Sequence, residues 1–212
     1  MSYLTFPLLQ SVSTTLRTLP TFAARKRYCD ANFTRLAAGS GRIVYALDDC
    51  RVLKLAKNIK GVAQNTVESD YALHDMYDNI VTRVFDLDED ARWLVAERAT
   101  KTTKKRFRNI VGLDFDVAFA YIAQRHYERT KPRFWLAPTP SLTPEQKVVL
   151  TALTDDHFFA GGLVGLMTDF DMPYGDFRRL SSYGEVCRDG QVQVVLSDYG
   201  LTEDVYASHY KR

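Results

Sequence analysis

The pattern of apolar residues changes near residue 100, and this change constrains the fold more than any other feature of the sequence. Between Phe33 and Ala99, short apolar runs alternate with turn residues, as they do in β-strands. After Thr100, most apolar residues recur at helical spacing. A strand-rich segment followed by a mostly helical one predicts an α+β fold, with a first lobe at 33–100 and a mostly helical second lobe at 101–212.

The strand-rich segment predicts a five-stranded antiparallel sheet with one helix. Turn signals at 39–41 and 48–49 divide residues 33–56 into three strands. Acidic residues at 86–90 separate the apolar runs of two further strands, which form a second hairpin. Between these groups, residues 61–77 carry apolar side chains at helical spacing, so we expect one amphipathic helix there.

Residues 1–32 show a looser helical pattern of apolar residues. Pro7 and Pro20 interrupt it, and a proline inside a helix removes a backbone hydrogen bond and clashes with the preceding turn. We therefore expect a helical extension that packs on the first lobe.

The second lobe contains clear local signals. Apolar spacing predicts a helix over 113–129, and Thr143, followed by a proline and an acidic residue, is typical of a helix start. Asp189 and Gly190 between two apolar runs predict a tight β-hairpin. The apolar stretch 158–167 contains three glycines and fits either a close-packed helix or an irregular segment.

Length, charge and cysteine content exclude several classes of protein. With 212 residues and a formal net charge of +2, the chain can bury a core of its own and has no global field that would favour nucleic acid or an anionic membrane. Cys29, Cys50 and Cys187 are odd in number and widely spaced, which fits neither a disulfide framework nor a zinc site. No apolar stretch approaches the roughly 20 residues of a membrane helix. These features predict a soluble, cytoplasmic protein.

Five features that could take part in binding or catalysis follow one another along the chain. A glycine-rich hairpin at 39–41 precedes Lys54 within a strand and Glu68 within a helix; Asp176 lies in a later acidic loop, and Asp198 ends an apolar strand. This order resembles that of the protein kinases: phosphate-covering loop, strand lysine, helix glutamate, catalytic aspartate and metal-binding aspartate. The chain resembles a small, divergent protein-kinase-like protein of the kind that phages encode, whose setting would be the host cytoplasm.

The resemblance implies an ATP site in the first lobe. Two glycines separated by one residue let backbone amides approach phosphate oxygens, and the strand that follows would cover the base. The segment after the last strand of the sheet would correspond to the kinase hinge, whose backbone binds an adenine edge. The residues that would contact ATP in this way are Gly39, Ser40, Gly41, Val44, Glu97 and Ala99.

Lys54 would position the α- and β-phosphates with Glu68 as its partner. A lysine among apolar strand residues loses hydration unless it meets an anion. Lys57 is the competing lysine, but it falls at the strand end and on the opposite face by the period of two. Asp70 and Asp75 are alternative partners on other parts of the same predicted helix.

The resemblance assigns the catalytic base and the metal ligands to the second lobe. Asp176 would orient the acceptor hydroxyl, and Asp198 would bind Mg²⁺ that bridges the phosphates. Ser181 stands five residues after Asp176, where kinases carry a metal-binding asparagine. Asp169 and Asp171 could take the role given to Asp176. Few residues remain after Asp198, so the helices of the second lobe must come before Asp176.

These features predict an ATP- and Mg²⁺-dependent phosphotransferase that acts on a hydroxyl acceptor, expected to be a protein. The alternative is a catalytically weak pseudokinase that serves as a nucleotide- or protein-binding module, which the missing asparagine favours. A third hypothesis concerns the basic run 101–108, whose five cations and Phe107 could bind nucleic acid or an acidic partner. A solvated helix face is the common explanation for such a run, and the balanced net charge argues against a nucleic-acid binder.

Overall fold

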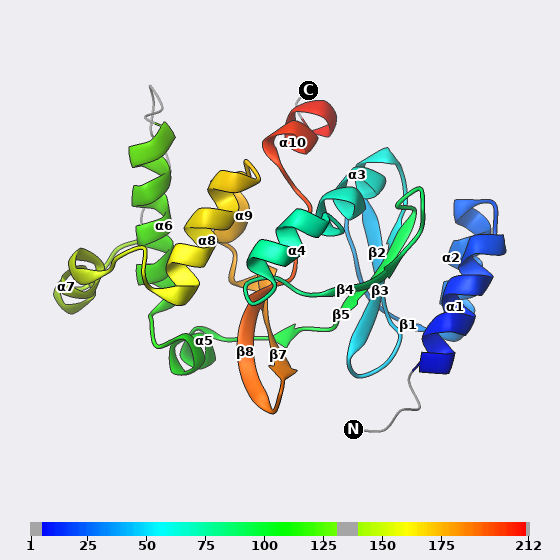
Figure 1. Ribbon diagram of the computed structural model, residues 1–212, viewed down its shortest axis with the longest axis horizontal. Coiled ribbons are helices and arrows are strands. Elements are labelled where there is room, and N and C mark those ends of the chain that lie inside the picture. Colours follow the sequence, from blue (N-terminus) through cyan, green and yellow to red (C-terminus); the bar gives the residue numbers. More distant parts are fainter. Residues whose placement is uncertain (1–5, 131–139, 211–212) are drawn as a thin grey trace. The chain divides into compact units, whose positions relative to one another are not determined.

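The protein is described by a computed structural model that covers residues 6–130 and 140–210, without the side chains of residues 6–9, 129–130 and Asp176. The chain forms two compact units (Figure 1). The first consists of Met1–Asp70 and Arg83–Arg98, and the second of Tyr71–Thr82 and Ala99–Arg212.

The first unit is built on a five-stranded antiparallel sheet, and the predicted α+β class with this sheet is confirmed. Its strand order is β1-β2-β3-β5-β4, so the last two strands along the chain add to the edge formed by β3. The strands are β1 (Thr34–Ala38), β2 (Arg42–Ala46), β3 (Arg51–Ala56), β4 (Val84–Leu87) and β5 (Trp93–Glu97).

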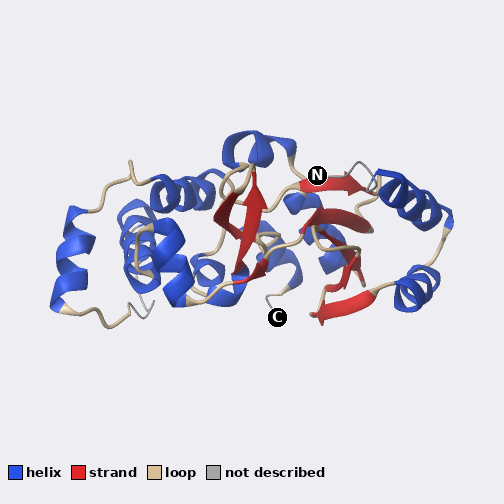
Figure 2. Ribbon diagram, turned by 90° about the horizontal axis from the view of Figure 1, so that it is seen from below, coloured by secondary structure: helices blue, strands red, loops and turns tan. Residues whose placement is uncertain are grey.

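One face of the sheet is covered by two helices, α1 (Phe6–Thr18) and α2 (Phe22–Asn32), as Figure 2 shows. Val12 and Leu16 of α1 and Cys29 of α2 lie in one buried cluster with the side chains of alternate strand residues. The strand members of this cluster are Ile43, Tyr45, Leu53, Leu55, Trp93 and Val95. The described part of the predicted extension, residues 6–32, therefore covers one side of this core.

The opposite face carries the intervening residues and packs against α3 (Ile59–Glu68). Val52, Leu94 and Ala96 are buried there, with Val44 and Val84 packed against them. Because neighbouring strands pair antiparallel, residues that lie directly opposite each other point to the same side of the sheet. The two faces thus differ in chemistry: the buried cluster on the first is apolar, whereas the other face mixes buried apolar residues with the cation of Lys54.

The predicted single helix over 61–77 is wrong, because the structure divides it into α3 and α4 (Tyr71–Tyr77). The backbone amide of Ser69 still bonds to Asn65 O at 3.0 Å, but that of Asp70 bonds to Val67 O at 3.2 Å, so the helical bonding pattern tightens and α3 ends there. Serine, threonine and valine near this point have modest helix propensity. The break also separates the two units, since α4 belongs to the second.

The second unit contains a small sheet and several helices. Its sheet has the order β6-β7-β8, with β6 (Thr100–Lys101), β7 (Tyr183–Arg188) and β8 (Gln191–Leu196). Besides α4, its helices are α5 (Lys104–Val111), α6 (Phe115–Thr130), α7 (Pro144–Ala152), α8 (Phe158–Asp169), α9 (Tyr174–Phe177) and α10 (Glu203–His209).

Local signals were accurate in this unit. Thr143 begins α7 with a capping box, in which its side chain accepts from the backbone amide of Gln146 while the Gln146 side chain accepts from the amide of Thr143. Asp189 and Gly190 turn the β7–β8 hairpin with φ angles of 52° and 78°. The stretch left open at 158–167 is a helix, and it buries Phe159, Ala160, Leu163, Val164, Leu166 and Met167.

The basic run forms β6 and the start of α5, and three of its five cations, Lys104, Arg106 and Arg108, pair with acids of the same unit. Lys104 contacts Asp116 at 2.7 Å, and Arg106 forms a bidentate pair with Glu185. Phe107 is buried against the rings of Phe115, Phe159 and Tyr183. The hypothesis that Phe107 could stack on a nucleobase is therefore wrong, because the helix turns this residue into the core.

No described helix combines the length and the apolar character that a bilayer-spanning segment requires.

Candidate functional site

Lys54 and Glu68 form a buried ion pair in the first unit. Lys54 lies in the middle of β3 with 6% of its surface exposed, directly opposite Val44 of β2 on one side and Leu94 of β5 on the other. Its Nζ donates to Glu68 Oε2 at 2.5 Å. Glu68, the last residue of α3, has no exposed surface. The ion pair expected from the order of the two residues is thus present.

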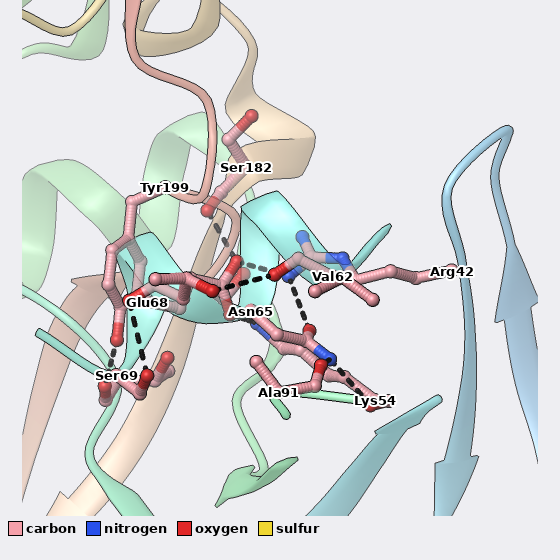
Figure 3. A network of polar contacts seen from close by, with 12 residues as sticks. Arg42, Lys54, Val62, Asn65, Glu68, Ser69, Ala91, Ser182 and Tyr199 are labelled. Atoms are coloured by element: carbon pink, nitrogen blue, oxygen red, sulfur yellow. Dashed lines mark hydrogen bonds and ion pairs between the residues drawn. The ribbon is translucent and has the colours of Figure 1, made fainter. Parts of the chain in front are cut away.

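A second cation shares the same carboxylate. Arg42, the first residue of β2, is 8% exposed, and its Nη1 lies 2.8 Å from Glu68 Oε1 (Figure 3). Asn65 of α3 completes the cluster: its Oδ1 lies 3.4 Å from Arg42 Nη1, while its Nδ2 donates to Ala91 O at 2.8 Å. Each oxygen of Glu68 therefore faces a different cation.

The two cations decide the charge state of Glu68. Burial by itself would raise the pKa of a carboxyl group, because it disfavours the charged form. Arg42 and Lys54 act in the opposite direction and hold the pKa of Glu68 below its ordinary value. The cluster is consequently one carboxylate between two cations at neutral pH.

The glycine hairpin between β1 and β2 is attached to the start of α3. Lys57 bonds to it twice, from its backbone amide to Gly41 O at 2.7 Å and from its Nζ to Gly39 O at 3.0 Å. Asn58, which caps α3, donates from Nδ2 to Ser40 O at 3.1 Å. Lys57 is exposed and holds the hairpin, which separates its role from that of Lys54.

A close backbone contact fixes this attachment. A Cβ atom on Gly61 of α3 would come within 2.2 Å of Gly41 O, so only glycine permits the two segments to approach this closely. Three successive carbonyls of the hairpin face the connection between β3 and α3. Since C=O and N–H point in opposite directions across a trans peptide, the amides of the same peptide groups face away from that connection.

The segment expected to bind an adenine edge is partly engaged within the first unit. The amide of Glu97 donates to Arg83 O, and that of Arg98 to Cys50 O, each at 2.8 Å. The Glu97 carboxylate accepts from the amide of Arg83 at 3.3 Å. Two of the amides in the predicted hinge thus complete the sheet, whereas Ala99 falls in the second unit.

Asp198 lies in the second unit, two residues after β8, with an exposed side chain. The residues on both sides of it are anchored. Ser197 donates to Ser182 O from its amide at 2.7 Å and from its hydroxyl at 3.0 Å. Tyr199 is buried, and its hydroxyl donates to Thr82 O at 2.6 Å. Asp198 therefore projects from a fixed stretch of backbone.

The remaining candidates of the second unit have different surroundings. Asp176 belongs to the short helix α9 where a loop was expected, and its side chain lies outside the described residues. Ser181 is exposed, one residue before the Ser182 carbonyl that holds Ser197. Asp169 accepts a hydrogen bond from the Tyr77 hydroxyl at 2.5 Å. Asp171 is exposed at a φ of 46°.

These residues fit a magnesium site only in part. No group of three potential ligands among His, Cys, Asp and Glu occurs in the part of the chain that the structure describes. Mg²⁺ commonly uses one or two carboxylates and fills its remaining positions with phosphate oxygens and water. The exposed carboxylate of Asp198 is a ligand of the required kind.

Sequence reasoning missed Arg42 and Asn65. Arg42 follows the glycines directly and stands two positions before Val44, so strand alternation places it on the Lys54 face. Asn65 lies three residues before Glu68, a spacing that places both side chains on one face of a helix. The alternation signal was available, but nothing local indicates that both side chains converge on one carboxylate.

A search of protein-family models and of curated proteins found no match to this sequence. Among solved structures, the chain is similar to SAICAR synthase from Saccharomyces cerevisiae, complexed with SAICAR, at 13% identity and a TM-score of 0.40 over 82% of this chain and 75% of that one. It is also similar to the aminoglycoside phosphotransferase APH(2″)-IIa, in a ternary complex with streptomycin and ATP, at 10% identity and a TM-score of 0.32 over 82% and 70% of the two chains. Both have protein-kinase-like folds.

Proposed function

We propose that this protein is an ATP- and Mg²⁺-dependent phosphotransferase of the protein-kinase-like kind, acting on a hydroxyl acceptor, with a protein as the expected substrate. The observation that carries the proposal is the buried Lys54–Glu68 pair on the sheet face that also presents Val44 and Val52. A charge is costly to bury, so a lysine in mid-strand with a dedicated helix glutamate favours a functional role for that face.

The first unit would bind and orient the nucleotide. Val44, Val52 and Ala96 form an apolar surface that suits a base, and Lys54 lies next to Val44 on the same face. The glycine hairpin would cover the phosphates with its amides. Glu68 would hold Lys54 in one position, so that its ammonium group meets the α- and β-phosphates without reorganisation.

The second unit would supply the groups for transfer. Asp198 would bind Mg²⁺, which when present neutralises the developing charge on the phosphates, and Ser181 is the candidate for a second, weaker contact to the metal. Asp176 would accept the proton of the acceptor hydroxyl and orient its oxygen toward the γ-phosphate. A serine in the place of an asparagine predicts slow turnover.

A thermal-shift titration with ATP and Mg²⁺ tests nucleotide binding. A ligand at 100 times its dissociation constant stabilises a protein by about 2.7 kcal/mol, so the wild type should melt at a higher temperature in millimolar ATP. We expect Lys54→Met to lose this shift and Asp198→Ala to lose its magnesium-dependent part. Lys105→Met, on the exposed side of α5, is the matched control and should behave as the wild type.

The second candidate function is a pseudokinase that binds a nucleotide or a protein without transfer. Ser181 in the asparagine position favours it. Incubation of the protein with γ-labelled ATP and Mg²⁺ distinguishes the two proposed functions. Release or transfer of label that Asp198→Ala abolishes supports the enzyme, whereas a thermal shift without any loss of ATP supports the binding protein. Absence of a shift at millimolar ATP would contradict both nucleotide-dependent readings.

A further inference from the structure

Arg42 occupies a position where the glycine hairpin meets the charged face of the sheet. It follows Gly41 directly and begins β2, two residues before Val44. Strand alternation places the side chains of Arg42, Val44 and Lys54 on the same face, because Val44 lies directly opposite Lys54. A cation at this point therefore stands between the hairpin and the strand lysine.

The guanidinium group of Arg42 is held in a fixed place. Glu68 Oε1 lies 2.8 Å from its Nη1, and Asn65 Oδ1 lies 3.4 Å from the same atom. Asn65 is itself anchored, with Nδ2 bonded to Ala91 O at 2.8 Å. A buried arginine with this support needs no rearrangement to present its charge.

The backbone that carries Arg42 is fixed as well. Gly41 O accepts the amide of Lys57 at 2.7 Å, and Gly61 makes room for that carbonyl. The hairpin, the start of α3 and the carboxylate at its end are thus tied together through neighbouring residues. The cluster that Arg42 joins through Glu68 is the one that holds Lys54 (Figure 3).

We propose that Arg42 is a second phosphate-site cation, which Glu68 holds beside Lys54 and which selects nucleotides that carry a polyphosphate chain. This inference rests on the proposed nucleotide site of the first unit. Arginine suits the task, since its planar guanidinium can bind a carboxylate and a phosphate through different N–H groups. A purely structural cluster would not need two buried cations on one carboxylate, because apolar residues commonly replace such groups without loss of stability.

The test compares ligands that differ only in their phosphates. The dissociation constants of ATP and of adenosine are measured by calorimetry for the wild type, Arg42→Met and Arg42→Lys. Arg35→Met is the matched control, since Arg35 is an exposed arginine of the neighbouring strand β1. Thermal melts without ligand report how far each variant is destabilised.

We expect Arg42→Met to weaken ATP binding about tenfold or more, the usual effect of one charge-assisted hydrogen bond, and to leave adenosine binding unchanged. Arg42→Lys should recover part of the loss, because it keeps the charge without the fork of N–H groups. Equal losses for ATP and adenosine would overturn the inference and show a structural role. ATP binding that Arg42→Met leaves intact would overturn it alone, whereas a wild type that binds no ATP would overturn the proposed function with it.

Discussion

Lys54 and Lys57 stand three positions apart, and strand geometry gives them different roles. Successive side chains of a strand point to opposite faces, so only Lys54 shares a face with Val44 and α3. Lys57 follows the last residue of β3 and reaches the hairpin carbonyl Gly39 O. The sequence alone was enough to prefer Lys54 over Lys57 as the partner of Glu68. That Arg42 contacts the same glutamate did not follow from the sequence.

Replacing Glu68 by glutamine should destabilise the protein strongly. The variant leaves Arg42 and Lys54 buried beside a neutral amide, and breaking a buried ion pair on one side costs about 3–5 kcal/mol. Urea unfolding measures this loss. Glu89→Gln, in the exposed loop between β4 and β5, is the control and should change the unfolding free energy by less than about 0.5 kcal/mol. If Glu68→Gln changed the unfolding free energy equally little, Glu68 would not be a buried carboxylate paired with Arg42 and Lys54.

The same glutamate predicts a pH dependence. Its pKa is lowered in the folded protein from the ordinary value of 4.5, so the unfolded chain binds a proton at a higher pH than the folded one. The contribution of Glu68 to stability is therefore complete above pH 4.5 and declines as the pH falls through the folded pKa. The difference in unfolding free energy between wild type and Glu68→Gln should shrink as the pH is lowered from 6 towards 3. A difference that stays constant over this range would contradict the assignment.

Among the elements, the glycine hairpin and α3 illustrate a contact that neither element specifies alone. Each has a plain local signal: glycines for the turn and an asparagine cap for the helix. Their attachment depends on Gly61, which contributes nothing to helix formation and permits the approach of Gly41 O. The end of α3 at Glu68 is marked by the change to an i to i−3 bond at Asp70, which apolar periodicity does not record, so periodicity alone predicted too long a helix.

The Gly61→Ala variant tests the contact between the glycine hairpin and α3, because it has two opposing effects on stability. Alanine favours a helix over glycine by about 1 kcal/mol, yet its Cβ would lie 2.2 Å from a backbone oxygen that cannot rotate away. Overpacking of this kind costs about 1–3 kcal/mol, so we expect a net loss of stability in chemical denaturation. Gly39→Ala is the control, because a Cβ there meets no atom within 4 Å and should leave stability nearly unchanged. A more stable Gly61→Ala variant would show that the two segments are not in contact.

At the scale of the whole molecule, charge is balanced globally and also paired locally. The formal net charge is +2, and in the basic run Lys104 lies against Asp116 and Arg106 against Glu185. Ion pairs of this kind reduce the field that a run of cations would otherwise present. The burial of Phe107 removes the aromatic group that could stack on a base.

We therefore expect no appreciable binding of nucleic acid. Non-specific binders typically have dissociation constants of about 10⁻⁴ to 10⁻⁶ M at physiological salt, and this protein should bind more weakly than that range. Fluorescence anisotropy with a labelled single-stranded oligonucleotide at 0.15 M salt provides the measurement. Tight binding that falls steeply with salt and is reduced in a Lys101→Ala/Lys105→Ala variant would contradict the expectation.

The sequence by itself determined the α+β class, the five-stranded sheet, the capped helix after Thr143 and the pairing of Lys54 with Glu68. These features depend on periodicity, turn residues and caps, which act over a few positions along the chain. Only the tertiary structure decided where α3 ends, that Arg42 joins the cluster, and that the amides of Glu97 and Arg98 complete the sheet. Such features depend on which distant groups meet each other's hydrogen-bonding and charge requirements, and a local pattern does not record that.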